Sequence, residues 1–161
     1  MIVVSNTSPL TNLAAIGKFD LLQKLYREIY IPEAVWNELN AQGRQWPGRQ
    51  EVAEAAWIKR QTVTDEPLVI SLQLDLDRGE AESIGLALSL AAEWILLDET
   101  EGRRIARRLG LRPVGVLGIL LQAKEHGWVE DVRPQLDALR QIAGFYVSEE
   151  VYQHVVTLAG E

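Results

Sequence analysis

Five short predicted strands, separated by stretches with helical spacing, constrain the fold of this chain more than any other feature. Residues 1–5 and 94–97 are apolar runs that end at polar residues, as buried strands do. Further short strands are predicted at residues 29–31, 58–63 and 113–116. Strands that alternate with helices favour a parallel sheet covered by helices on both faces. The run Trp94–Leu97 is apolar throughout and is therefore predicted to be a central strand.

Nine helices are expected between and after these strands. Ser8 is predicted to cap the first helix, because Pro9 at the next position suits the start of a helix. The other helices are predicted near residues 19–26, 32–39, 52–57, 80–92, 103–108, 117–125, 134–142 and 149–158. Residues 44–50, with Trp46, Pro47 and Gly48, are predicted to form a loop.

Length and composition exclude several classes of protein. The 161 residues are enough for one domain with a hydrophobic core, and no linker or repeat divides them, so we expect a single domain over residues 1–161. The chain has no cysteine, which excludes disulfide frameworks, zinc fingers and thiol nucleophiles. No apolar run approaches the ~18–20 residues of a membrane span, and we expect a cytoplasmic protein. The net charge of −7 means that a nucleic-acid partner would require a local basic patch or metal ions.

Polar side chains follow two of the predicted strands. Asn6 comes directly after the first strand, and Asp98 and Glu99 follow the fourth. The carboxyl ends of parallel strands share one edge of a sheet, where ligands usually bind, so we expect Asn6 and Asp98 to lie close together. Glu38 is carried by the helix that follows the second strand.

The helix before the fourth strand carries two acids that face different ways. Glu80 continues the apolar stripe that Ile84, Ala87 and Leu88 form on that helix, whereas Glu82 lies about 200° around the helix axis from Glu80. A carboxylate on an apolar face needs a partner, and Mg²⁺ or Mn²⁺ suits carboxylate oxygens. We therefore expect Glu80 to join Asn6 and Asp98, and Glu82 to point elsewhere.

Each of these residues also has a purely structural interpretation. Asp77 and Glu80 have the spacing of a capping box, which needs no metal. Glu38 could be a solvated helix residue, and Asn6 could form a turn that starts the first helix. Asp98 is the most telling position, because the end of a buried strand is a functional location.

Four stretches of the chain resemble the PIN-domain superfamily, and within it a toxin-related, nucleic-acid-binding group of bacteria and archaea. The stretches are Val3–Leu10, Ile31–Leu39, Gly79–Ala87 and Leu96–Glu99, and the likeness runs in order from residue 2 to about residue 128. The resemblance implies a three-layer α/β/α sandwich with a central, mostly parallel sheet of four or five strands. It also implies a ribonuclease whose acids surround Mg²⁺ or Mn²⁺.

The superfamily's four acidic positions fall on Asn6, Glu38, Glu80 and Asp98, and Glu82 and Glu99 are neighbours that a one-residue shift would promote. Asn6 departs from the pattern, because the superfamily usually has Asp there. A neutral amide oxygen weakens metal binding. Two hypotheses follow: a metal-dependent, single-strand-preferring ribonuclease acting as the toxin of a toxin–antitoxin pair, or a catalytically weak PIN fold that binds RNA or a protein. A receiver-like signalling domain is a remoter third.

Basic and apolar surfaces suggest the partners. Arg103, Arg104 and Arg107 have helical spacing and are candidates for contacting RNA phosphates, although a solvated helix face would look the same. Arg44 and Arg49 flank Trp46 in a loop that could contact single-stranded RNA. The C-terminal helices, within residues 131–161, carry more apolar side chains than a lone terminal helix uses. They could pack on the sheet, form a dimer or receive an antitoxin.

Overall fold

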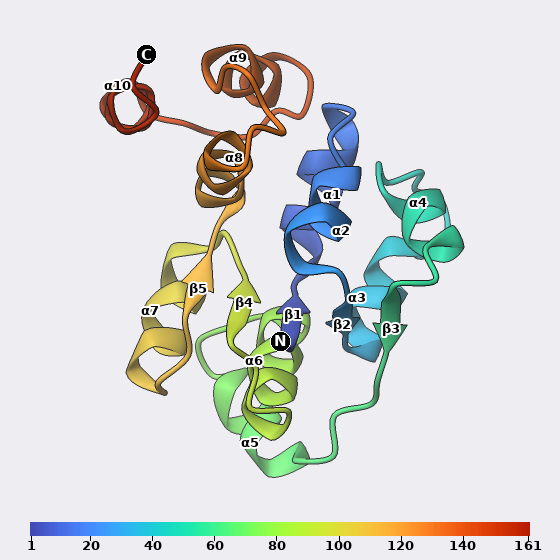
Figure 1. Cartoon of the computed structure of the whole chain (residues 1–161). Coiled ribbons are helices and arrows are strands. Elements are labelled where there is room, and N and C mark those ends of the chain that lie inside the picture. The colour runs from blue at the N-terminus through green and yellow to red at the C-terminus, as the bar shows by residue number, and fades with distance from the viewer.

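A five-stranded, all-parallel sheet forms the middle layer of the computed structural model, which describes residues 1–161 (Figure 1). The strands are β1 (Val3–Ser5), β2 (Ile29–Ile31), β3 (Ile58–Arg60), β4 (Trp94–Leu96) and β5 (Pro113–Val114). Their order across the sheet is β3-β2-β1-β4-β5, and each neighbouring pair is parallel. The predicted α/β fold with a parallel sheet is confirmed.

The strand order reverses between β1 and β4. From β1 the chain adds β2 and then β3 on one side, and it returns to place β4 and β5 on the other. Ser5 at the end of β1 is paired with Leu96 at the end of β4. Loops therefore leave the two strand ends in opposite directions, and such a switch point is where open parallel sheets bind ligands.

Ten helices flank the sheet. They are α1 (Thr7–Ala15), α2 (Asp20–Tyr26), α3 (Glu33–Leu39), α4 (Arg49–Glu54), α5 (Glu66–Leu72), α6 (Arg78–Ser89), α7 (Thr100–Arg108), α8 (Val116–Glu125), α9 (Arg133–Gln141) and α10 (Glu149–Leu158). None of them has the length and apolar character that a membrane crossing requires.

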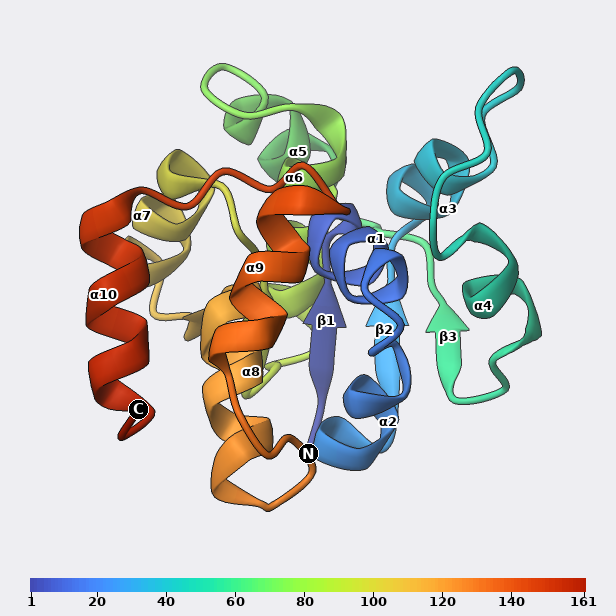
Figure 2. The ribbon, with the colours of Figure 1, turned by 90° about the horizontal axis from the view of Figure 1, so that it is seen from above.

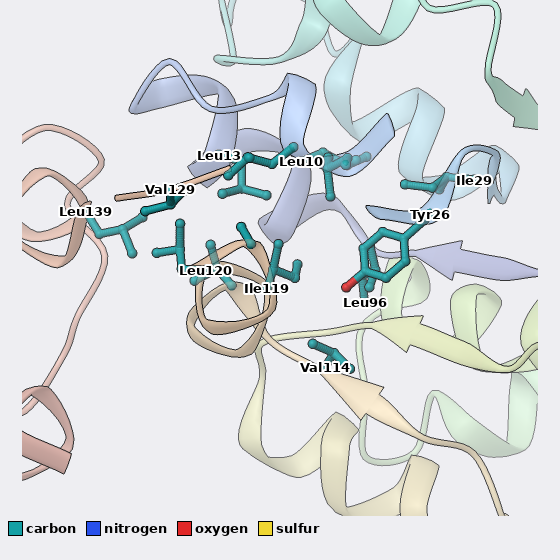
Figure 3. Close-up of a cluster of buried hydrophobic side chains, with 14 of the residues drawn as sticks. Leu10, Leu13, Tyr26, Ile29, Leu96, Val114, Ile119, Leu120, Val129 and Leu139 are labelled. Atoms are coloured by element: carbon teal, nitrogen blue, oxygen red, sulfur yellow. The ribbon is translucent and has the colours of Figure 1, made fainter. Parts of the chain in front are cut away.

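Two hydrophobic clusters lie on opposite faces of the sheet, because successive strand residues point to opposite sides. Val3 and Leu96 contribute to the larger cluster, to which α1, α2, α3, α4, α8, α9 and α10 add buried side chains. Val4 and Ile95 contribute to the smaller one, which α5, α6 and α7 cover. Figure 1 shows the two helical layers on either side of the sheet, Figure 2 looks down on the layer that contains α1, α8, α9 and α10, and Figure 3 shows part of the larger cluster between α1, α8 and the sheet.

Two local predictions were wrong. The first helix begins at Thr7, with Asn6 rather than Ser8 at its N-cap, and the Ser8 hydroxyl donates instead to Asp98. The helix α5 was not predicted, although Asp65 caps it by accepting a hydrogen bond from the Leu68 N–H. Only Val69 and Leu72 of α5 are buried, so its apolar stripe is too short to stand out in the sequence.

Candidate functional site

A cleft of about 600 Å³ opens at the carboxyl ends of β1 and β4. Its lining is mostly polar and comes from segments far apart in the chain: Asn6, Thr7, Ser8, Thr11, Asn12, Glu38, Trp46, Asp77, Glu80, Asp98, Glu99, Thr100, Gly144, Phe145 and Tyr146. We call it the acidic cleft. It contains all four residues on which the sequence placed a PIN-type site, and it lies at the switch point of the sheet.

Asn6 leaves β1 at the floor of the acidic cleft and is 8% exposed. Its backbone N–H donates to the Leu96 carbonyl across the two strand ends at 2.9 Å. Its side chain makes no capping hydrogen bond to α1, and its Oδ1 lies 3.5 Å from the Ser83 hydroxyl of α6. The alternative interpretation, in which the Asn6 side chain exists to start the helix, is therefore wrong.

Gly79, in the first turn of α6, lies where three side-chain oxygens meet. A Cβ atom at this position would stand 3.2 Å from Glu38 Oε2, 3.3 Å from Asn6 Oδ1 and 3.5 Å from Asp77 Oδ1. The three oxygens therefore surround one small space that only glycine leaves open. Glu38 is oriented there by Thr7, whose hydroxyl donates to Glu38 Oε2.

Glu80 is buried beside this space, at 8% exposure. Its backbone N–H donates to Asp77 Oδ1 at 2.8 Å, which is the cap expected from the sequence. Burial raises the pKa of the Glu80 carboxyl to about 8, and Asp77, Glu99 and Glu38 add to the rise through a hydrogen bond or negative charge. Glu80 is thus a buried carboxyl group among other acids, and no cationic side chain offsets the rise of its pKa.

Asp98 is held quite differently. Its Oδ1 accepts the Val116 N–H at 2.7 Å, and its Oδ2 accepts the Ser8 hydroxyl at 2.8 Å. Asn12 completes the chain by donating to Ser8 Oγ at 2.9 Å. Burial raises the pKa of Asp98, while these two donors and the nearby Arg103 oppose the rise. Asp98 therefore ties the end of β4 to the starts of α1 and α8.

Arg103 also lies near Asp98. Its guanidinium donates to the Leu97 carbonyl at 3.2 Å and is half-buried. A Cβ atom on Gly115 would stand 2.8 Å from Asp98 Oδ1 and 3.0 Å from Arg103 Nη1. Burial lowers the pKa of Arg103, and the neighbouring Arg107 adds to this effect. Glycine at position 115 thus allows the carboxylate and the guanidinium to share one space.

The two neighbouring acids take different positions. Glu82 is 6% exposed and lies outside the acidic cleft, because its Oε1 accepts the Ala34 N–H of α3 at 3.1 Å and its Oε2 pairs with Arg78 at 2.6 Å. The sequence expected it to point away from Glu80, and it does. Glu99 lines the acidic cleft, where it is exposed and accepts from the Glu101 N–H at the start of α7.

The arginines predicted to contact RNA also have different surroundings in the structure. Arg104 is paired with Glu101 one turn earlier, so its charge is already neutralised. Arg107 is exposed and has no ion-pair partner. The Arg44 guanidinium lies 4.8 Å from the centre of the Trp46 ring. Arg49 begins α4 and does not line the acidic cleft.

Several lining residues escaped sequence reasoning. The sequence indicates Asp77 only as a helix cap, whereas in the structure its carboxylate also faces Gly79. Ser8 and Asn12 have an i,i+4 spacing that could have signalled a polar face on α1. Phe145 and Tyr146 gave no such signal, because they reach the acidic cleft from the loop between α9 and α10.

The oxygen atoms of the acidic cleft fit a hard divalent cation in their chemistry. Asn6, Glu38, Asp77 and Glu80 offer only oxygen donors, and the space that Gly79 leaves open lies among three of them. In the structure itself no three Asp, Glu or His side chains stand close enough to form a ready metal-binding group. A cation would therefore have to draw the Glu38 and Glu80 carboxylates together.

The protein is thus an α/β protein with a 3-2-1-4-5 parallel sheet and an acidic cleft at the switch point of that sheet. The chain matches the PIN-domain family over residues 2–161, and it belongs to that family. PIN domains are generally nuclease-like, which points to nucleic-acid binding, and they typically use divalent metal ions. No curated protein matches the chain significantly.

Proposed function

We propose that this protein is a metal-dependent endoribonuclease that prefers single-stranded RNA. The observation that carries the proposal is the meeting of Asn6, Glu80 and Asp98 in one cleft, although Asn6 and Asp98 are more than ninety residues apart in the chain. Function is assigned from such a site rather than from the fold alone. The net charge of −7 adds a second argument, since an acidic cleft would repel RNA unless cations were bound in it.

Each residue has a separate role in this proposal. Asn6, Glu38 and Glu80 would hold Mg²⁺ or Mn²⁺, which supplies an activated water and neutralises charge on the leaving oxygen. The proton that Glu80 holds below its pKa of about 8 would leave as the cation binds. Asp98, with its ties to Ser8 and Val116, fixes the geometry of the two strand ends.

A weak or inactive PIN fold that binds RNA or a protein is the second candidate. Two observations favour it: Asn6 brings no charge, and both oxygens of Asp98 already accept hydrogen bonds. Ligand charge tunes the affinity of cation sites, so each of these features weakens metal binding. Under this candidate the acidic cleft is a remnant of a catalytic site.

The resemblance noted in the sequence also supports a role as the toxin of a toxin–antitoxin pair in the cytoplasm. The antitoxin, or a second copy of the chain, would cover apolar side chains that the C-terminal helices leave exposed, such as Val151 and Leu158. A short neighbouring gene, and growth arrest that its product relieves, would support this role. Expression without any effect on growth would count against it.

Cleavage of a mixed RNA pool in Mg²⁺, Mn²⁺ or EDTA distinguishes the two candidates. We expect wild-type protein to cleave with metal and not in EDTA, Asn6→Asp to bind Mn²⁺ more tightly with equal or higher activity, and Asp98→Asn to be inactive. Glu82→Gln is the matched control, because this buried acid lies outside the acidic cleft. No Mn²⁺ binding by any of these proteins would reject the nuclease and leave the binding module.

A further inference from the structure

Tyr146 is an exposed aromatic residue that has no stacking or hydrogen-bond partner in the folded chain. It is 85% exposed, although it lines the acidic cleft. The other three tyrosines donate their hydroxyls to Gln122, Glu28 and Asp137. All five tryptophans have an aromatic ring or an arginine against them. Neither the ring nor the hydroxyl of Tyr146 has such a partner.

The backbone on both sides of Tyr146 is fixed. The Phe145 N–H donates to the Leu139 carbonyl at 2.9 Å. The Val147 carbonyl accepts two hydrogen bonds from Arg140, at 2.8 and 3.2 Å, and the Val147 side chain is buried. The Arg140 guanidinium is itself held 4.3 Å from the centre of the Tyr152 ring. The loop therefore presents an unpaired ring from a rigid base, which lowers the entropy cost of binding.

The surroundings of this ring suit a flat apolar group on a polar chain. Of the fifteen residues that line the acidic cleft, three are hydrophobic, and all three are aromatic: Trp46, Phe145 and Tyr146. Arg44 covers one face of Trp46 and adds a positive charge beside the cleft. Isolated aromatic side chains among polar ones are the pattern that single-stranded nucleic-acid sites use. An unpaired nucleotide has the required shape and polarity.

We propose that Tyr146 is a stacking platform for one unpaired nucleobase of a strand whose backbone lies in the acidic cleft. The inference rests on the proposed function, because it takes single-stranded RNA as the occupant of that cleft. Stacking is open to every base, so the platform selects unpaired nucleotides rather than a sequence. A base held in a duplex cannot reach it, which gives the single-strand preference a physical cause.

The test is the binding of a non-cleavable strand in Mg²⁺, measured by fluorescence anisotropy. The probes are a labelled ten-nucleotide 2′-O-methyl RNA and an abasic oligomer of the same length. We expect Tyr146→Ala to weaken binding of the first by about tenfold and to leave the second unchanged. Tyr146→Phe should bind both as wild-type protein does.

Trp128→Ala is the matched control. Trp128 is also an exposed aromatic residue, at 39%, but it stacks on His126, follows the end of α8 and does not line the acidic cleft. Equal binding of the base-bearing strand by Tyr146→Ala and wild-type protein would overturn the inference, as would an equal loss for both probes. Cleavage of natural RNA is scored separately, so a protein that stacks bases without cleaving would reject only the nuclease.

Discussion

The carboxylates on the two walls of the acidic cleft have opposite surroundings. On one wall Asp98 accepts hydrogen bonds from Ser8 and Val116 and lies near Arg103. On the other, Glu80 faces further acids, and its pKa rises to about 8. Burial raises the pKa of both groups, but only Asp98 has donors that offset the cost. Hydrogen-bond donors within the protein thus offset the burial of Asp98, whereas no such donor or cationic side chain offsets the burial of Glu80, and we propose that a bound cation would do so.

The largest expected effect on stability comes from removing the Asp98 carboxylate. Asp98→Ala leaves the Val116 N–H and the Ser8 hydroxyl, which are at least half-buried, without their acceptor. We expect a loss of about 2–4 kcal/mol in the free energy of unfolding. Urea denaturation measures it, and a loss below about 0.5 kcal/mol would mean that Asp98 does not tie the strand ends together.

At Glu80 we expect a substitution to raise the free energy of unfolding at high pH rather than to lower it. Its pKa in the folded protein, about 8, lies above its ordinary value of 4.5, so folding strengthens proton binding. The stability of the wild-type protein should therefore fall as the pH rises from about 4.5 to about 8, without metal. Glu80→Gln should remove this dependence.

We expect Glu80→Gln to exceed wild-type stability by about 1–2 kcal/mol at pH 9 and to match it near pH 4.5. Thermal unfolding in EDTA over this pH range measures the gap. A difference in stability that is the same at every pH would show that Glu80 is not protonated in the folded protein. It would also show that burial among other acids does not destabilise the charged form of Glu80.

A smaller effect sharpens the account of the Asp98 wall. Ser8→Ala removes one of the two hydrogen bonds to Asp98 and leaves Asn12 without its acceptor. We expect a loss of about 1 kcal/mol. Ser89→Ala is the matched control, since Ser89 is an exposed helix serine that bonds only to the Leu86 carbonyl. Equal losses in the two variants would indicate a general effect of serine in helices.

The smallest effect separates two arginines that the sequence could not distinguish. Arg107 is exposed and unpaired, whereas Arg104 is paired with Glu101. If RNA phosphates lie along α7, Arg107→Ala should lower the affinity for single-stranded RNA by about threefold and reduce its salt dependence by about one ion. Arg104→Ala should change less. A larger change for Arg104→Ala would show that RNA displaces the ion pair.

The sequence predicted the parts of the site that follow local patterns. Asn6 and Asp98 interrupt apolar strands, and the parallel sheet brings such interruptions to one edge. Helical periodicity separated Glu80 from Glu82 correctly, because both lie on one regular helix, α6. Whether these residues bind metal or act in catalysis stays a prediction.

The rest depends on contacts that no local pattern encodes. Ser8 and Asp98 are ninety residues apart, so their hydrogen bond exists only because β1 and β4 are neighbours. Tyr146 reaches the acidic cleft from a loop whose path is fixed by Arg140 and Leu139. Gly79 and Gly115 have no Cβ atom, and this lets the neighbouring side chains come close to the backbone at both positions. Such roles come from packing between elements, which a single sequence does not reveal.

Calorimetric titration with Mn²⁺ at pH 7 tests the contrast between the two walls most directly. Wild-type protein should bind the ion with release of a proton from Glu80, Glu80→Gln should bind at least tenfold more weakly, and Glu82→Gln should match the wild-type protein. Equal affinity in wild-type protein and Glu80→Gln, or no binding by the wild-type protein, would contradict the assignment of the Glu80 wall as a cation site.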